Sequence, residues 1–243
     1  MVIESREDAL GQCARRLVAL NERFPLPVVR TSTDAEDLLD ELVYFTLRNR
    51  SARLNADAAF RELRRRFPTW HQLTLAPRCE IEEAIRPAGL VHQRAELIQK
   101  LVARIENDFP DGSYGAIRTW DDLAILRYLT SLPGIGQFAA YQAMLYVLGR
   151  SVLPVAWPLT RLLTRLGIVD QSFGPEAVLD AAASLLATGE HRVLYDNLLE
   201  HARAICTPRT PRCRRCQLSD LCAYNKRVRL RRGLAALEPM SED

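Results

Sequence analysis

Four cysteines near the end of the chain form the densest group of residues that could do chemistry. They are Cys206, Cys213, Cys216 and Cys222, in the spacing C-x6-C-x2-C-x5-C. Four soft thiolates within 17 residues are too dense for an ordinary core, so they predict either disulfides or a metal centre. The remaining cysteines, Cys13 and Cys79, are far away in the sequence.

Compartment and spacing help to choose among these possibilities. The sequence shows no signal peptide and no apolar run of membrane length, so we expect a reducing, intracellular setting in which disulfides are rare. Structural zinc sites usually use two closely spaced cysteine pairs, whereas here only Cys213 and Cys216 are so close. The long first and third gaps suit a loop that wraps a cube-shaped cluster. The residues therefore favour an iron–sulfur cluster and leave zinc as the alternative.

Basic residues gather around these cysteines. Residues 203–232 include ten arginines or lysines against one acid, Asp220, although the net charge of the whole chain is only +3. A loop fixed by a metal would hold Arg209 and Arg212 in place, so presenting them to phosphates would cost little ordering entropy. The sequence thus predicts a polyanionic partner. A second basic run at residues 61–66 is explained equally well by a solvated helix face.

A glycine-rich turn, Leu132-Pro133-Gly134-Ile135-Gly136, separates two segments with helical periodicity. Two glycines around one apolar residue allow the backbone to press closely against another molecule. The following helix is expected to begin at Gln137, which leaves free amides and a positive dipole end at the turn. This geometry suits a phosphate, although the motif alone fits a plain interhelical turn as well.

Helical periodicity dominates the chain, and no alternating strand pattern of useful length occurs. Apolar residues recur at three- and four-residue spacing in residues 6–22, 36–48, 55–66, 93–106, 120–131, 137–148, 157–167, 175–187 and 191–205. Proline and glycine stand between these segments, as interhelical turns require. With 243 residues, 48% of them hydrophobic, the chain can bury one large or two modest cores, so we predict a folded all-α protein.

The turn and the cysteine loop together resemble the endonuclease III and adenine glycosylase branch of the helix-hairpin-helix DNA glycosylases. Further matches in the family's order are Phe67-Pro68-Thr69, Gly89-Leu90 and His201-Ala202-Arg203, so the resemblance spans residues 36 to 226 approximately. The resemblance implies a 4Fe–4S cluster on the four cysteines, with a structural rather than a catalytic role.

The same resemblance implies two lobes with a DNA cleft between them. A six-helix barrel with the helix-hairpin-helix would occupy residues 36–150, and an iron–sulfur cluster domain would occupy 151–230. The N-terminal helix in residues 1–35 would pack with the cluster domain, and 231–243 would form a tail. The resemblance also implies a cytoplasmic, nucleoid-associated monomer that binds double-stranded DNA carrying a damaged or abasic nucleotide. No membrane partner is expected.

DNA contacts are carried over from the family position by position. Those at the hairpin are Gly134, Ile135, Gly136 and Phe138, and those in the cysteine loop are Arg209 and Arg212. Leu90 matches the apolar wedge of relatives, although core packing would explain it as well. The family's gap-filling glutamine falls at Arg48 or Asn49. Asn49 is closer in chemistry, while Arg48 would add charge and stacking.

The family's catalytic residues are missing at the matching positions. Bifunctional members form a Schiff base through a lysine two residues after the second hairpin glycine, and Phe138 stands there. The family's aspartate is matched by Ala156, between the matching Val155 and Arg161. An alanine can neither take a proton nor offset positive charge on the sugar. The adenine-specific branch also uses a glutamate on an early helix, and its counterpart here is Phe45, with Glu41 one helical turn away. Other carboxylates, better explained as helix caps or surface charges, are Asp121, Asp122 and Asp170.

Three functions remain open at this point. The first is a DNA glycosylase of base-excision repair with reduced or altered activity, including weak cleavage at abasic sites. The second is a non-catalytic relative that keeps the scaffold and binds lesions. The third is an unrelated zinc-dependent regulator, which the hairpin argues against.

Overall fold

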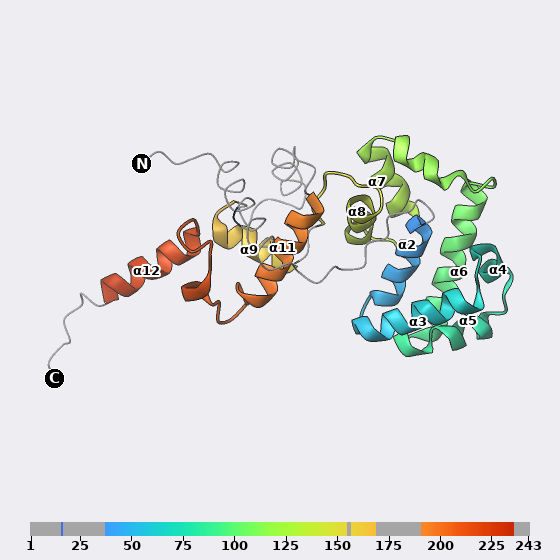
Figure 1. Ribbon diagram of the computed structural model, residues 1–243, viewed down its shortest axis with the longest axis horizontal. Coiled ribbons are helices and arrows are strands. Elements are labelled where there is room, and N and C mark those ends of the chain that lie inside the picture. Colours follow the sequence, from blue (N-terminus) through green and yellow to red (C-terminus); the bar gives the residue numbers. More distant parts are fainter. Residues whose placement is uncertain (1–15, 17–36, 155–156, 169–190, 236–243) are drawn as a thin grey trace. The chain divides into compact units, whose positions relative to one another are not determined.

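The computed structural model describes residue 16 and residues 37–154, 157–168 and 191–235. Helices are the only regular elements in these ranges, which confirms the all-α prediction (Figure 1). The chain divides into two compact units, one of Arg30–Arg150 and one of Met1–Val29 with Ser151–Asp243. Within the described ranges, no helix is both long enough and apolar enough to cross a membrane.

The unit of Arg30–Arg150 is built around one long helix, α6. Its elements are α2 (Asp37–Arg48), α3 (Arg53–Arg66), α4 (Trp70–Leu75), α5 (Arg78–Ala84), η1 (Arg86–Ala88), α6 (Val91–Asp108), η2 (Ser113–Thr119), α7 (Asp122–Ser131) and α8 (Gln137–Tyr146). Helix α6 packs against α2, α4 and α5, and α8 packs against α2 and α7. Ile98, Leu101 and Val102 of α6 are completely buried, as their helical spacing predicts.

Two short helices, α4 and α5, were not predicted, because six or seven residues are too few to show a helical period. Local hydrogen bonds form α4 instead. Thr69 and Gln72 make a capping box, in which each side chain accepts a hydrogen bond from the other residue's backbone amide. At the other end, the Gln99 side chain of α6 donates to the carbonyls of Thr74 and Ala76. These bonds fix α4 on α6.

The unit that contains the cysteines has α9 at its centre. Its described elements are α9 (Trp157–Leu166), α11 (His191–Ala204), η3 (Cys213–Arg215) and α12 (Ala223–Ala235), and α9 packs against both α11 and α12. Leu159, Leu162 and Leu163 form its buried face. The helices expected at 6–22 and 175–187 lie outside the described residues, apart from residue 16.

The end of this unit differs from the sequence-based expectation. We expected residues 231–243 to form a tail. Helix α12 instead runs through Gly233 to Ala235. A single glycine costs an exposed helix only about 1 kcal/mol, and the neighbouring arginine, leucine and alanine residues are good helix formers.

Candidate functional site

The hairpin turn between α7 and α8 is rigidly defined. The Ile135 amide donates to the Leu132 carbonyl over 3.2 Å, and Gly134 has a φ of 75°. With Pro133 before the glycine, this is a type II turn, which requires a positive φ at its third position. A Cβ on Gly134 would lie 2.5 Å from Cδ2 of Leu97 on α6. Both backbone conformation and space therefore demand glycine at 134.

Gly136 is different, because nothing inside the protein demands glycine there. Its φ of −83° and ψ of 169° are open to any residue, and an added Cβ would meet nothing within 4 Å. No side chain caps α8, whose first backbone bond runs from the Ala140 amide to the Gly136 carbonyl. The amides of Gln137 and Phe138 therefore have no partner within the helix. The start of α8 is an uncapped helix end beside open space, as an anion site requires.

Phe138 lies in the first turn of α8 and is 43% exposed. An aromatic ring, which offers no amine and no general base, is thus exposed at the position that the resemblance assigns to the lysine. Ala156, at the position of the family's aspartate, lies outside the described residues.

Two exposed segments of the same unit carry three further predicted DNA contacts. Leu90, between η1 and α6, is 54% exposed, so the core-packing explanation is wrong. Arg48 and Asn49, at the end of α2, are also exposed. The Arg48 side chain folds back to donate to the Ser51 carbonyl over 2.5 Å, whereas no such bond holds the Asn49 side chain within the described residues.

All four loop cysteines line a single cavity in their unit, together with His201 and Arg165. None of the four forms a disulfide. Within the described residues, no three potential ligands are gathered closely enough to hold one metal ion. The four cysteines around one cavity are a donor set that a structural zinc ion or an iron–sulfur cluster could use.

Burial favours the neutral form of two of these thiols. It raises the pKa of Cys216 to about 11 and also raises the pKa of Cys222. A bound metal reverses this preference, because the ligand is the thiolate. His201 is buried beside Cys216, with its Nε2 at 3.4 Å from the sulfur, and burial lowers the pKa of His201 to about 4. At neutral pH this histidine is therefore uncharged.

Two arginines of α9 fix the start of the cysteine loop. Arg161 donates to the carbonyls of Cys206, over 3.1 Å, and of Ala202, over 2.6 Å. Arg165 donates to the carbonyls of Thr207 and Pro208, and its Nη1 also lies 3.4 Å from the Cys206 sulfur. The bond to Ala202 satisfies a carbonyl in the last turn of α11, and the other bonds satisfy carbonyls of the loop that follows. Sequence reasoning used Arg161 only as an alignment marker and missed Arg165, although their spacing of four places them on one helix face.

The basic residues of the loop are exposed and uncompensated. They are Arg209, Arg212, Arg214 and Arg215, and none of them forms an ion pair within the described residues. The loop's one acid, Asp220, pairs instead with Arg16 over 2.7 Å. This bond connects Arg16, the one described residue among the first 36, to the cysteine loop.

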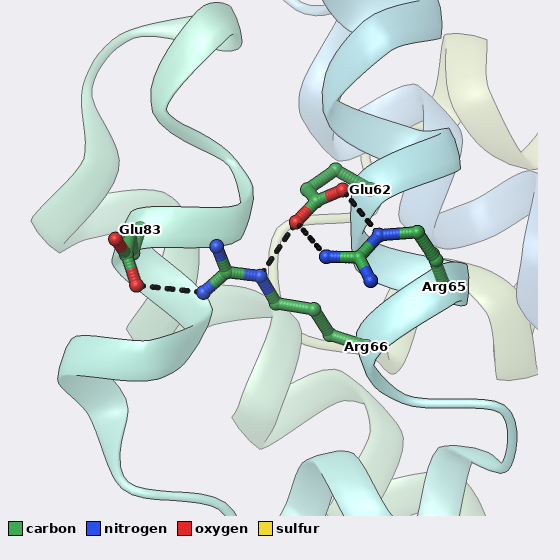
Figure 2. A network of polar contacts seen from close by, with 4 residues as sticks. All are labelled: Glu62, Arg65, Arg66 and Glu83. Atoms are coloured by element: carbon green, nitrogen blue, oxygen red, sulfur yellow. Dashed lines mark hydrogen bonds and ion pairs between the residues drawn. The ribbon is translucent and has the colours of Figure 1, made fainter.

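The second basic run, on α3, is compensated by acids. Figure 2 shows Arg65 and Arg66 donating to Glu62, with Arg66 also reaching Glu83 over 2.7 Å. Hydrogen bonds from Arg65 and then Arg66 lower the pKa of Glu62 to about 2. Arg64 stacks on the Trp70 ring, 4.7 Å from its centre. These three arginines therefore form a structural surface network and leave little free charge for a polyanion. The exception is Arg61, which donates to the Asp57 carbonyl and has no acidic partner within the described residues.

Asp121 and Asp122, two of the three other carboxylates, have local structural partners. Asp121 caps α7 by accepting from the Ala124 amide over 2.8 Å, and Asp122 lies 3.4 Å from Arg150. Asp170 lies outside the described residues. The capping and surface roles predicted for Asp121 and Asp122 are confirmed.

Comparisons with known proteins point in one direction. No protein-family model matches the chain. It is 30% identical over 186 residues to the thymine-DNA glycosylase of Aeropyrum pernix, covering 74% of this chain and 79% of that protein. It is 26% identical to the endonuclease III of Thermotoga maritima over 90% of this chain and 94% of that protein. A solved endonuclease III in a non-covalent DNA complex has the same fold, with a TM-score of 0.71, 22% identity and coverage of 95% of this chain and 100% of that one.

Proposed function

Since this chain belongs to the endonuclease III-like helix-hairpin-helix DNA glycosylases, we propose that it binds damaged or abasic duplex DNA in base-excision repair. The observation that carries this proposal is the hairpin. Its turn is locked by Gly134 against α6, and the uncapped start of α8 opens beside Gly136. An uncapped helix start that no internal contact occupies suits a phosphate of the DNA backbone.

The cysteine loop supplies the second set of phosphate contacts. Arg209 and Arg212 are exposed and lack acidic partners within the described residues, so their charge remains available to DNA. Such contacts give affinity without sequence readout and make binding salt-dependent. The compensated arginines of α3 are not expected to contribute.

Leu90 and Asn49 are proposed to probe the duplex. Leu90 exposes an apolar side chain at a turn, as a wedge between stacked bases requires. Asn49 is favoured over Arg48 for filling the space left by a displaced nucleotide, because Arg48 is already bonded to the Ser51 carbonyl.

A 4Fe–4S cluster is proposed for the four cysteines that line the cavity of the C-terminal unit. When bound, it would cross-link the loop and so hold Arg209 and Arg212 in position. Arg165 would then donate a charge-assisted hydrogen bond toward the Cys206 sulfur. His201, whose Nε2 lies 3.4 Å from the Cys216 sulfur, would then lie directly beside that ligand.

The chemistry that we propose is slow removal of a damaged base by water, with weak cleavage at abasic sites. Phe138 provides neither an amine for a Schiff base nor a carboxylate, and the sequence has Ala156 at the position of the aspartate. The exposed Phe138 ring can instead stack against a displaced base or sugar. The same observation favours a second candidate function, a relative that binds lesions without turnover.

One experiment separates these two candidates. Oligonucleotide duplexes that carry a panel of damaged bases are incubated with excess protein, and abasic sites are cleaved with alkali. The enzyme proposal expects base release from at least one lesion and little covalent complex after borohydride treatment. Tight binding with no release from any lesion supports the binding relative instead. Efficient borohydride trapping by the unaltered protein would mean that another amine attacks the sugar.

A matched set of variants sharpens the assignment of the site. Phe138→Lys with Ala156→Asp should raise base release more than either change alone, because nucleophile and carboxylate act as a unit. If each change alone has a small effect on base release and the double change gives only their sum, the two positions do not belong to one site.

A further inference from the structure

Arg94 is a buried arginine that the proposed function has not used. It lies in the first turn of α6, and only 5% of the residue is exposed. Within the described residues no acid pairs with it, and burial lowers its pKa. A buried charge without a counter-ion is costly unless hydrogen bonds compensate it. The partners of Arg94 should therefore show what it does.

Those partners are backbone carbonyls from two segments that are distant in sequence. Nη1 donates to the carbonyls of Ala88 and Gly89, the latter over 2.8 Å, and Nη2 donates to the carbonyl of Asn49. Asn49 follows the last turn of α2, and Gly89 follows η1, so these carbonyls lie at helix ends. The two arms of one planar guanidinium thus connect both segments.

Both connected segments contain strained backbone. Within the described residues, the non-glycine positions with positive φ are Arg50, at 55°, and Leu90, at 50°. Each lies next to a carbonyl that Arg94 binds. A left-handed conformation costs an ordinary residue free energy and persists only where surrounding bonds impose it. Here Arg94 provides bonds that can hold both turns.

We propose that Arg94 is a positioning residue that fixes Asn49 and Leu90 at one separation, so that both side chains enter the duplex together. This inference rests on the proposed function. Lysine could keep the charge of Arg94, but a single ammonium group cannot reproduce the fork that bridges the two segments. Arg94→Lys is therefore the informative change.

The first measurement needs no DNA. Amide hydrogen exchange reports on Asn49, bonded to the Phe45 carbonyl over 3.0 Å, and on Gly89, bonded to the Arg86 carbonyl over 3.2 Å. In Arg94→Lys both amides should exchange about tenfold faster, as expected when one charge-assisted hydrogen bond is lost. The Ile135 amide of the hairpin should be unchanged. Faster exchange of only one segment, or of neither, would overturn the bridging role.

The second measurement tests the coupling on DNA. The observable is the ratio of affinities for a duplex with a tetrahydrofuran abasic analogue and for the same duplex undamaged. Arg94→Lys should lower this ratio by about tenfold while affinity for undamaged DNA is retained. Leu90→Ala should lower the ratio in the parent protein and have little further effect in Arg94→Lys. A merely structural loss of stability would not produce this non-additivity.

The control is Arg104→Lys on the same helix, where the side chain pairs with Asp108 over 2.8 Å, far along α6 from both turns. It should change neither the exchange rates nor the affinity ratio. Fully additive effects of Arg94→Lys and Leu90→Ala would overturn the inference while leaving the proposed function intact. If the unaltered protein shows no preference for the abasic duplex, the proposed function itself fails.

Discussion

Gly136 offers a way to separate binding of DNA from stability of the fold. In Gly136→Val the new side chain enters space where no protein atom lies within 4 Å of the Cβ, at a φ of −83° that valine adopts readily. The cost to folding should be about 1 kcal/mol, since valine is a poorer N-cap than glycine. The valine methyls would, however, occupy the space beside the free amides of α8. Each charge-assisted amide–phosphate bond that is lost should reduce affinity by at least about tenfold.

Gly134→Ala should show the opposite pattern. Its Cβ would lie 2.5 Å from a Leu97 methyl, at a φ of 75°. The left-handed conformation costs about 1–2 kcal/mol and overpacking about 1–3 kcal/mol. Fluorescence anisotropy on an abasic-analogue duplex measures affinity, and urea unfolding measures stability. Gly115→Val, also in open space, is the control for the valine itself. If Gly136→Val binds DNA as tightly as the parent protein, phosphate recognition at this turn is refuted.

Three further changes test other parts of the account. Arg209→Ala should reduce the slope of log affinity against log salt by about one unit, whereas Arg65→Ala, whose side chain already pairs with Glu62, should leave the slope unchanged. In anaerobic preparations, the Cys206→Ser variant should contain less iron, lack the absorbance at about 400 nm and bind DNA more weakly. Stoichiometric zinc in the unaltered protein would contradict the proposed cluster. The pKa of Glu62 is lowered from 4.5 to about 2, so its stabilising effect is present above pH 4.5 and is lost as the pH falls toward 2. The difference in free energy of unfolding between the parent protein and Glu62→Gln should therefore shrink over that range in urea titrations, and a difference independent of pH would contradict the network.

Much of the fold could be predicted from the sequence, because long amphipathic helices such as α6 repeat their apolar positions over several turns. The tight turn at Gly134 could also be predicted, since a proline followed by a glycine favours a turn through these two residues alone. The short helices α4 and α5 could not be predicted, because they span too few residues to show a helical period. Helix α4 depends in addition on its capping box and on Gln99 of a distant helix.

Some features of the candidate site could likewise be predicted from the sequence, and others could not. The spacing of the cysteines predicted that the four thiols lie close together, and all four line one cavity. The neutralised arginines of α3 could not be told from a free basic patch, because Glu83 is 17 residues away from Arg66 in the chain. The bridging role of Arg94 could not be predicted either, because the Asn49 carbonyl that it binds is 45 residues away in the sequence. Long-range pairing leaves no periodic trace in a sequence.

Recognition of damaged DNA is common to the enzyme and to the binding relative, so one competition experiment tests the central claim most directly. A labelled duplex with a single tetrahydrofuran abasic analogue is bound to the protein and displaced by unlabelled duplexes of the same sequence, with or without the analogue. The account predicts that the abasic duplex competes at least about tenfold better, since an unpaired position is easier to open and to fill. Equal competition by the two duplexes would contradict it.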